Sequence, residues 1–210
     1  MTSFICRNLT RPSSVAHVRT GRYRSSGLLP IALAGLVLLA GCGGDDNQGP
    51  SDEQIKAEME QILTDFQTLA KAEPDLPTKW FNDKGIMDEL GLTGNLLVEY
   101  GCRMYADSSW SITYEGQPLW LTLSLFYMGT PEGAKKAIDL AAPDYPSTTA
   151  LPEGITALRD EGALAFAYGP YYVIVLDSSE MSHTGYVPRD PAKAAIEAIK
   201  KVLPQQETAE

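Results

Sequence analysis

The chain has 210 residues, of which 21% are charged, and its formal net charge at pH 7 is −10. An acidic chain repels phosphate backbones, so we expect no nucleic-acid partner. Its three cysteines and two histidines do not form the pattern of a zinc site or a disulfide framework. No phosphate-binding or dinucleotide-binding motif is present, so we expect neither a metal nor a cofactor.

The first 41 residues have the pattern of an export signal. Residues 1–27 carry five arginines and no acid, and residues 28–40 are almost wholly apolar. An apolar run of 13 residues is shorter than the roughly 20 that a membrane-spanning helix needs. We therefore expect residues 1–41 to be a signal peptide rather than a transmembrane helix.

The signal ends in Leu39-Ala40-Gly41-Cys42, which resembles the lipobox of bacterial lipoproteins. In that family the cysteine receives a diacylglyceryl thioether, and the chain is cut just before it. The resemblance implies lipidation at Cys42 and attachment to a bacterial membrane through the lipid. Gly43 in place of aspartate favours the outer membrane if the cell is Gram-negative. The alternative is an ordinary secretory signal in which Cys42 is incidental.

Processing would leave 12 basic residues against 27 acidic ones, a net charge near −15. Residues 42–51 are polar and rich in glycine, with two aspartates, and we expect a flexible acidic tether there. Residues 52–204 have the length of one domain, and residues 205–210 should form a disordered tail.

A first helix is predicted over residues 52–72. Apolar side chains recur at steps of three and four residues from Ile55 to Leu69. Ser51 and Gln54 have the spacing of a capping box at its start.

Two groups of strand patterns follow, each ending in a helix. The strands are predicted at about 96–105, 110–114, 119–128, 155–159, 162–168 and 171–177. The later helices begin at Thr130-Pro131 and Asp190-Pro191, and residues 143–154 form a proline-rich loop. Residues 171–177 are apolar on both faces, which predicts a central strand.

This order predicts an α+β fold. The elements follow as one helix and then two βββα halves with short links between strands. Short links favour antiparallel pairing, so we expect a mainly antiparallel sheet of about six strands with helices packed on one face.

Aromatic side chains provide a candidate binding surface on this sheet. It consists of Tyr100, Trp120, Tyr168, Tyr171 and Tyr172. Exposed tyrosine and tryptophan can bind sugars, peptides or a protein partner. The alternative is that they reflect strand propensity and core filling.

No catalytic residue is assigned. His183 is the only histidine after the signal, and no GxSxG motif is present, so a hydrolase triad has no base beside a nucleophile. Cys102 lies in an apolar stretch and should be a buried, inert thiol. Glu99 and Asp177 are the acids most closely associated with apolar strands, and a carboxylate enzyme would need two acids across a cleft.

Three segments resemble a family of uncharacterised exported bacterial proteins. They begin at Asn95 (NLLVEYG), Phe126 (FYMGTPEGA) and Gly162 (GALAFAYGPYYV), and together the resemblance covers about residues 94–177. That family has no assigned activity, so the resemblance implies export and nothing about chemistry.

Two hypotheses for function follow. The first is a lipid-anchored, non-enzymatic binding or interaction module of the cell envelope, with an envelope protein as one candidate partner. The alternative is a carboxylate-dependent hydrolase acting on envelope glycans.

Overall fold

The structure, a computed structural model, describes residues 49–114, 116–177 and 188–203. The predicted signal peptide, the lipidation site Cys42, most of the tether, the tail and His183 lie outside the described residues. Within the described ranges no helix is both long and apolar enough to cross a membrane.

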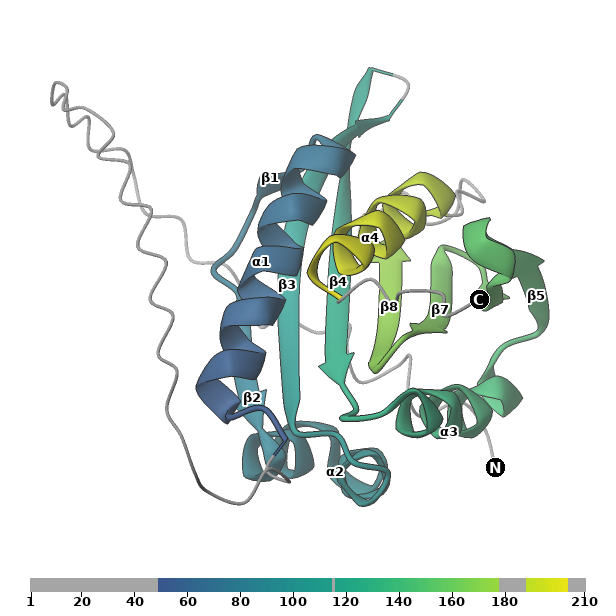
Figure 1. Ribbon diagram of the computed structural model, residues 1–210. Helices are drawn as coiled ribbons and strands as arrows, with labels where there is room; N and C mark the ends of the chain where they lie inside the picture. Colours follow the sequence, from purple (N-terminus) through teal and green to yellow (C-terminus); the bar gives the residue numbers. More distant parts are fainter. Residues whose placement is uncertain (1–48, 115, 178–187, 204–210) are drawn as a thin grey trace, which may run out of the picture. The chain divides into compact units, whose positions relative to one another are not determined.

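An eight-stranded antiparallel sheet is the centre of the fold (Figure 1). Its strands are β1 (Glu73–Pro74), β2 (Lys79–Asn82), β3 (Met104–Tyr114), β4 (Gln117–Tyr127), β5 (Ser147–Ala150), β6 (Thr156–Asp160), β7 (Ala163–Tyr168) and β8 (Tyr171–Asp177). Their order is β1-β3-β4-β8-β7-β6-β5, and β2 also pairs with β3. The β4–β8 pairing joins the two halves of the chain, with Phe126 opposite Tyr172.

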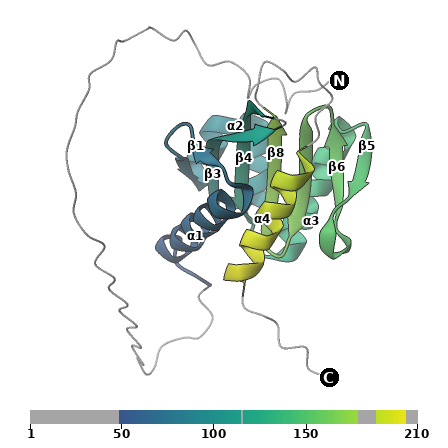
Figure 2. The ribbon, with the colours of Figure 1, turned by 90° about the horizontal axis from the view of Figure 1, so that it is seen from above.

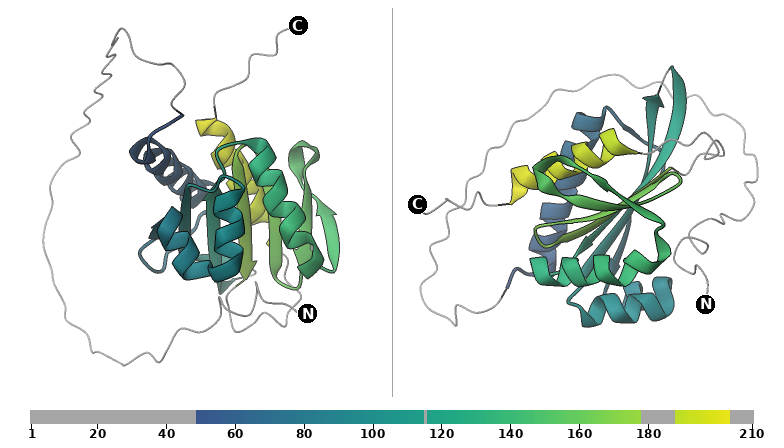
Figure 3. Two further views of the ribbon diagram at one scale, coloured as in Figure 1. Left: turned by 90° about the horizontal axis from the view of Figure 1, so that it is seen from below. Right: turned by 90° about the vertical axis from the view of Figure 1, so that its right-hand side faces the viewer.

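Within the described residues, four helices cover the sheet, two on each face (Figures 2 and 3). They are α1 (Asp52–Ala70), α2 (Asp83–Glu99), α3 (Pro131–Ala141) and α4 (Arg189–Val202), with short 3-10 helices at Ala142–Asp144 and Pro152–Gly154. One core lies between the sheet and α1 with α4. The second core lies between the opposite face and α2 with α3.

The first helix forms as the sequence predicts. The Ser51 side chain accepts a hydrogen bond from the Gln54 backbone, and the Gln54 side chain accepts one from the Ser51 backbone. Ile55, Met59 and Phe66 lie on one face and are fully buried. Because α4 presents alanines to the same core, α1 and α4 pack together above the sheet.

The α+β class and the antiparallel sheet are confirmed, and β8 is a central strand between β4 and β7. The sheet has eight strands rather than about six, because β1, β2 and β5 are too short to leave a strand pattern in the sequence. Helices also lie on both faces rather than on one. Phe126 and Tyr172 make the second face apolar, so that face needs a cover of its own.

The strand predicted at about 96–105 is mostly helical in the structure. Residues up to Glu99 belong to α2, and the strand begins only at Met104. Asn82 caps this helix by accepting a hydrogen bond from the Gly85 backbone. A short apolar run such as Leu96-Leu97-Val98 fits a buried helix turn as well as a strand, and the contact with α3 and the sheet decides between them. The βββα repeat is therefore incomplete in the first half.

Candidate functional site

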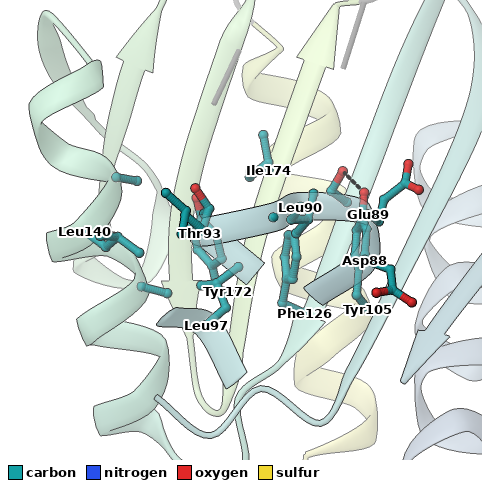
Figure 4. Close-up of a pocket in the computed structure, with 15 residues that line it drawn as sticks. Asp88, Glu89, Leu90, Thr93, Leu97, Tyr105, Phe126, Leu140, Tyr172 and Ile174 are labelled. Carbon is teal, nitrogen blue, oxygen red and sulfur yellow. Dashed lines mark hydrogen bonds between the residues drawn. The ribbon is translucent and has the colours of Figure 1, made fainter. Parts of the chain in front are cut away.

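A cavity of about 440 Å³ lies between α2, α3 and the sheet face that they cover (Figure 4). The sheet supplies the floor, and the two helices supply the walls. The cavity is lined by Asp88, Glu89, Leu90, Gly91, Leu92, Thr93 and Leu97 of α2, Ala137, Leu140 and Ala141 of α3, and Tyr105, Ser124, Phe126, Tyr172 and Ile174 of the sheet. This volume falls within the usual range for small-molecule sites.

The floor is part of a row of four stacked rings, Phe81, Tyr105, Phe126 and Tyr172, which we call the aromatic row. Each ring comes from a different strand, and each is the direct cross-strand partner of the next. Successive ring centroids are 5.1, 4.3 and 5.2 Å apart, and the planes are tilted by 17°, 2° and 29°. Because both faces of the Tyr105 and Phe126 rings are covered by neighbouring rings, these two rings line the cavity with their edges.

A kink in α2 shapes the outer wall. Gly91 interrupts the helix with φ 59° and ψ −129°, and the chain continues in a second helical segment. The two segments pack closely, because a Cβ added at Gly94 would lie 2.3 Å from the carbonyl oxygen of Ile86. Leu92 follows the kink and is 84% exposed. The kink thus folds α2 over the cavity instead of letting it run away from the sheet.

A hydrogen-bonded chain of side chains borders the cavity on its β3 and β4 side. The Ser124 hydroxyl donates to Asp107 Oδ1 at 3.1 Å, and the oxygens of Tyr105 and Ser124 lie 3.5 Å apart. Serine has one hydrogen, so a Ser124 that donates to Asp107 accepts from Tyr105. Burial, followed by the negative charge of Asp107, raises the pKa of Tyr105 above its usual range. The phenol therefore stays protonated, and both Ser124 and Asp107 are hydrogen-bond partners for it.

Among the described residues that line the cavity, the charged ones are all acids. Asp88 and Glu89 are exposed neighbours on α2, and Figure 4 shows both on the Tyr105 side of the cavity. The described residues that line the cavity include no lysine or arginine. Lys136 of α3 instead places its Nζ 5.7 Å from the centroid of the Tyr100 ring.

The five aromatic residues of the predicted binding surface are divided between the two faces of the sheet. Tyr171 is fully buried against α1, where its hydroxyl donates to Glu58, and Tyr168 packs against the same core. Tyr100 packs against the opposite core, and Tyr172 is 4% exposed and lines the cavity.

Trp120 is the fifth residue of the predicted binding surface. It is 41% exposed and lies on the same strand as Phe126, six residues before it and therefore on the same face. The five side chains therefore do not form one continuous exposed platform, and only Tyr172 belongs to the cavity.

The acids singled out in the sequence do not line the cavity either. Glu99 is exposed at the end of α2, and Asp177 is buried at the end of β8 beside Leu121 of β4. Cys102 is 1% exposed, as expected, and burial raises the pKa of its thiol to about 12. This thiol does not reach the cavity.

Sequence reasoning missed most of the cavity because it placed a strand where the second half of α2 lies. One sequence pattern did indicate that this face of the sheet is covered. Residues 119–128 carry apolar side chains on both faces, and Phe126 belongs to the face opposite the leucines. A second apolar face of the sheet must be covered by other elements, which here are α2 and α3.

Within the described ranges no group of three or more histidine, cysteine, aspartate or glutamate side chains could hold a metal ion. Comparisons with protein-family models, curated proteins and solved structures give no significant match to this chain. The chemistry of the cavity is therefore the basis for a functional proposal.

Proposed function

We propose that this chain is a lipid-anchored binding protein of the bacterial cell envelope, which takes a small ligand with an apolar body into the cavity beneath α2. The observation that carries the proposal is the cavity itself, with ring edges as its floor and aliphatic walls from two helices. The resemblance of residues 39–42 to a lipobox supports the anchor and the location.

The groups that line the cavity fit ligand binding better than they fit catalysis. Apolar side chains dominate it, which favours uptake of an apolar body by burial of its surface. The Ser124 hydroxyl is hydrogen-bonded to a carboxylate and a protonated phenol. A nucleophile needs a neighbouring base that removes its proton, and no histidine or lysine lines the described cavity.

The glycan hydrolase has no specific support from this cavity. A carboxylate mechanism needs two acids on opposite sides of the scissile bond, roughly 5–10 Å apart. Asp88 and Glu89 are consecutive residues at one rim, and the other described lining residues are not acids. We therefore argue for binding alone.

The proposal can be tested by titrating the full chain with N-phenyl-1-naphthylamine, a neutral probe that fluoresces in apolar surroundings. We expect saturable binding of one probe per chain. Thr93, a half-buried rim residue that lines the cavity, is the position for a blocking variant. Thr93→Trp should weaken binding at least tenfold by filling the cavity, whereas Thr113→Trp adds the same side chain at an exposed site and should bind as the parent does.

The melting temperature of each variant shows that it is folded. No saturable binding by the parent chain would refute a ligand pocket. Equal binding by a folded Thr93→Trp variant would place the probe elsewhere on the molecule and would equally contradict the proposal.

A further inference from the structure

We infer that the cavity discriminates by charge and by hydrogen-bond polarity: it takes ligands that carry an amine or another donor group on an apolar, preferably aromatic body, and it excludes carboxylates and phosphates. The inference rests on the proposed function and adds the class of ligand.

The first argument is the direction of the hydrogen-bonded chain. Ser124 directs its hydrogen toward Asp107, and the Tyr105 hydrogen is held by Ser124 or by Asp107, which is also a hydrogen-bond partner of the phenol. The phenol oxygen of Tyr105 is then left with lone pairs only, so at the cavity it acts as an acceptor. A ligand group that meets this oxygen must supply a hydrogen, as an amine, ammonium or hydroxyl does and as a carboxylate does not.

The second argument is the charge at the rim. Asp88 and Glu89 are both acceptors and both negative, and Asp107 places a third carboxylate one hydrogen bond beyond the lining. The described lining offers no cation to compensate an anionic ligand. Exposed carboxylates are screened by water and salt, but beside a low-dielectric cavity their field extends to a bound ligand.

The third argument is the geometry of the floor. Stacking within the aromatic row covers both faces of the Tyr105 and Phe126 rings, so these two rings present their edges to the cavity. Ring edges carry partial positive charge and pack best against the face of another aromatic ring, in an edge-to-face arrangement. A flat aromatic body therefore fits this floor better than an alkyl chain of the same area.

The size of the effect that the rim carboxylates have on ligand affinity follows from Coulomb's law. A ligand ammonium a few ångströms from one exposed carboxylate gains on the order of 1 kcal/mol at high effective dielectric, which corresponds to about fivefold in affinity. Because water and salt screen exposed carboxylates, two of them at one rim should together favour an amine over a neutral analogue by about tenfold, less than the product of two unscreened factors, and should disfavour a carboxylate by a similar factor.

Three probes with one skeleton test the inference: 2-(1-naphthyl)ethylamine, 2-(1-naphthyl)ethanol and 3-(1-naphthyl)propionate. Their affinities for the full chain should be measured by isothermal titration calorimetry at pH 7 and low salt. We expect the amine to bind about tenfold more tightly than the alcohol, and the carboxylate to bind at least tenfold more weakly.

Two variants separate the charge from the acceptor. Asp88→Asn with Glu89→Gln should reduce the preference for the amine over the alcohol to about threefold or less. Tyr105→Phe should weaken amine and alcohol alike, by about three- to tenfold, because both lose the same acceptor. Glu73→Gln with Asp75→Asn makes the same charge change at exposed positions in and beside β1 and should change none of the three affinities.

The outcomes distinguish the inference from the proposed function. If the alcohol binds and the carboxylate binds as tightly as the amine, the pocket stands and the inference of charge selection is overturned. If the amine preference survives Asp88→Asn with Glu89→Gln, the rim acids are not its source and the inference is again overturned. If none of the three probes binds, the pocket and the selectivity inferred from it both fail.

Discussion

Gly91 occupies a backbone conformation, φ 59° and ψ −129°, that side chains other than glycine rarely adopt. No heavy atom lies within 4 Å of a Cβ built there, so the restriction comes from the backbone and not from crowding. One residue thereby sets the angle between the two halves of α2 and hence the height of the cavity wall.

We predict that Gly91→Ala lowers the free energy of unfolding by about 1–3 kcal/mol, because the backbone must keep a strained conformation or shift. A shift would also change the cavity wall and weaken probe binding. Chemical denaturation and the fluorescence titration measure the two effects. Gly49→Ala is the matched control, since Gly49 is exposed, has no positive φ and has free space around it. A Gly91→Ala variant as stable as the control would contradict this account.

Cys102 gives a prediction for alkaline pH. Burial raises the pKa of its thiol from 9.0 to about 12, so the folded chain holds this proton more tightly than the unfolded chain does. The stabilisation is fully present below pH 9 and is lost as the pH rises from 9 towards 12, at up to about 1.4 kcal/mol per pH unit.

The variant Cys102→Ala isolates this effect. It lacks the titrating thiol but keeps the tyrosines, so its stability should fall less steeply between pH 8 and pH 10.5 than that of the parent. Denaturant unfolding at both pH values measures the difference. Parallel loss of stability in the two chains would show that the thiol does not contribute.

At the scale of elements, α1 depends on its first turn. Ser51 and Gln54 satisfy each other's backbone donors, and Arg103 holds the same end by donating to the Pro50 carbonyl oxygen at 2.8 Å and to Asp52. The helix start is thus tied to the end of the sheet where β3 begins.

We predict that Ser51→Ala destabilises the chain by about 1 kcal/mol, because a backbone donor at the helix start loses its acceptor. The measurement is the midpoint of urea unfolding. Thr68→Ala is the control, since it removes another exposed hydroxyl from α1 that caps nothing. If the two variants were equally stable, the capping contribution would be negligible.

Elements also show where sequence reasoning succeeds and fails. The starts of α1 and α3 and the bounds of β6, β7 and β8 agree with prediction to within about two residues, because caps, turns and alternation are local signals. The second half of α2 was predicted as a strand, and the edge strands were not predicted. Those elements depend on partners far away in the chain, which local patterns do not report.

At the scale of the whole molecule, the main prediction concerns attachment. In a bacterial host the parent chain should incorporate an alkyne-labelled fatty acid and fractionate with membranes. Cys42→Ala should lose the label and leave the membrane fraction, because the predicted mature chain has 12 basic against 27 acidic residues and this net negative charge does not favour anionic lipid headgroups.

The control for this experiment is Cys102→Ala, which removes a different cysteine and should keep both the label and the membrane location. Label retained by Cys42→Ala would exclude Cys42 as the acceptor. Membrane retention without the label would point instead to a protein partner in the envelope.

The sequence by itself determined the α+β class, the strands β4, β6, β7 and β8, most helix boundaries and the expectation of export and lipidation, whereas β3 was predicted only as a shorter strand at 110–114. These follow from short-range patterns that need no knowledge of the fold. Only the tertiary structure decided that helices cover both faces, that α2 bends at Gly91 and that Tyr105, Phe126 and Tyr172 form one row. Strand register brings those three rings together from positions up to 67 residues apart, and the cavity exists only because a kinked helix covers them.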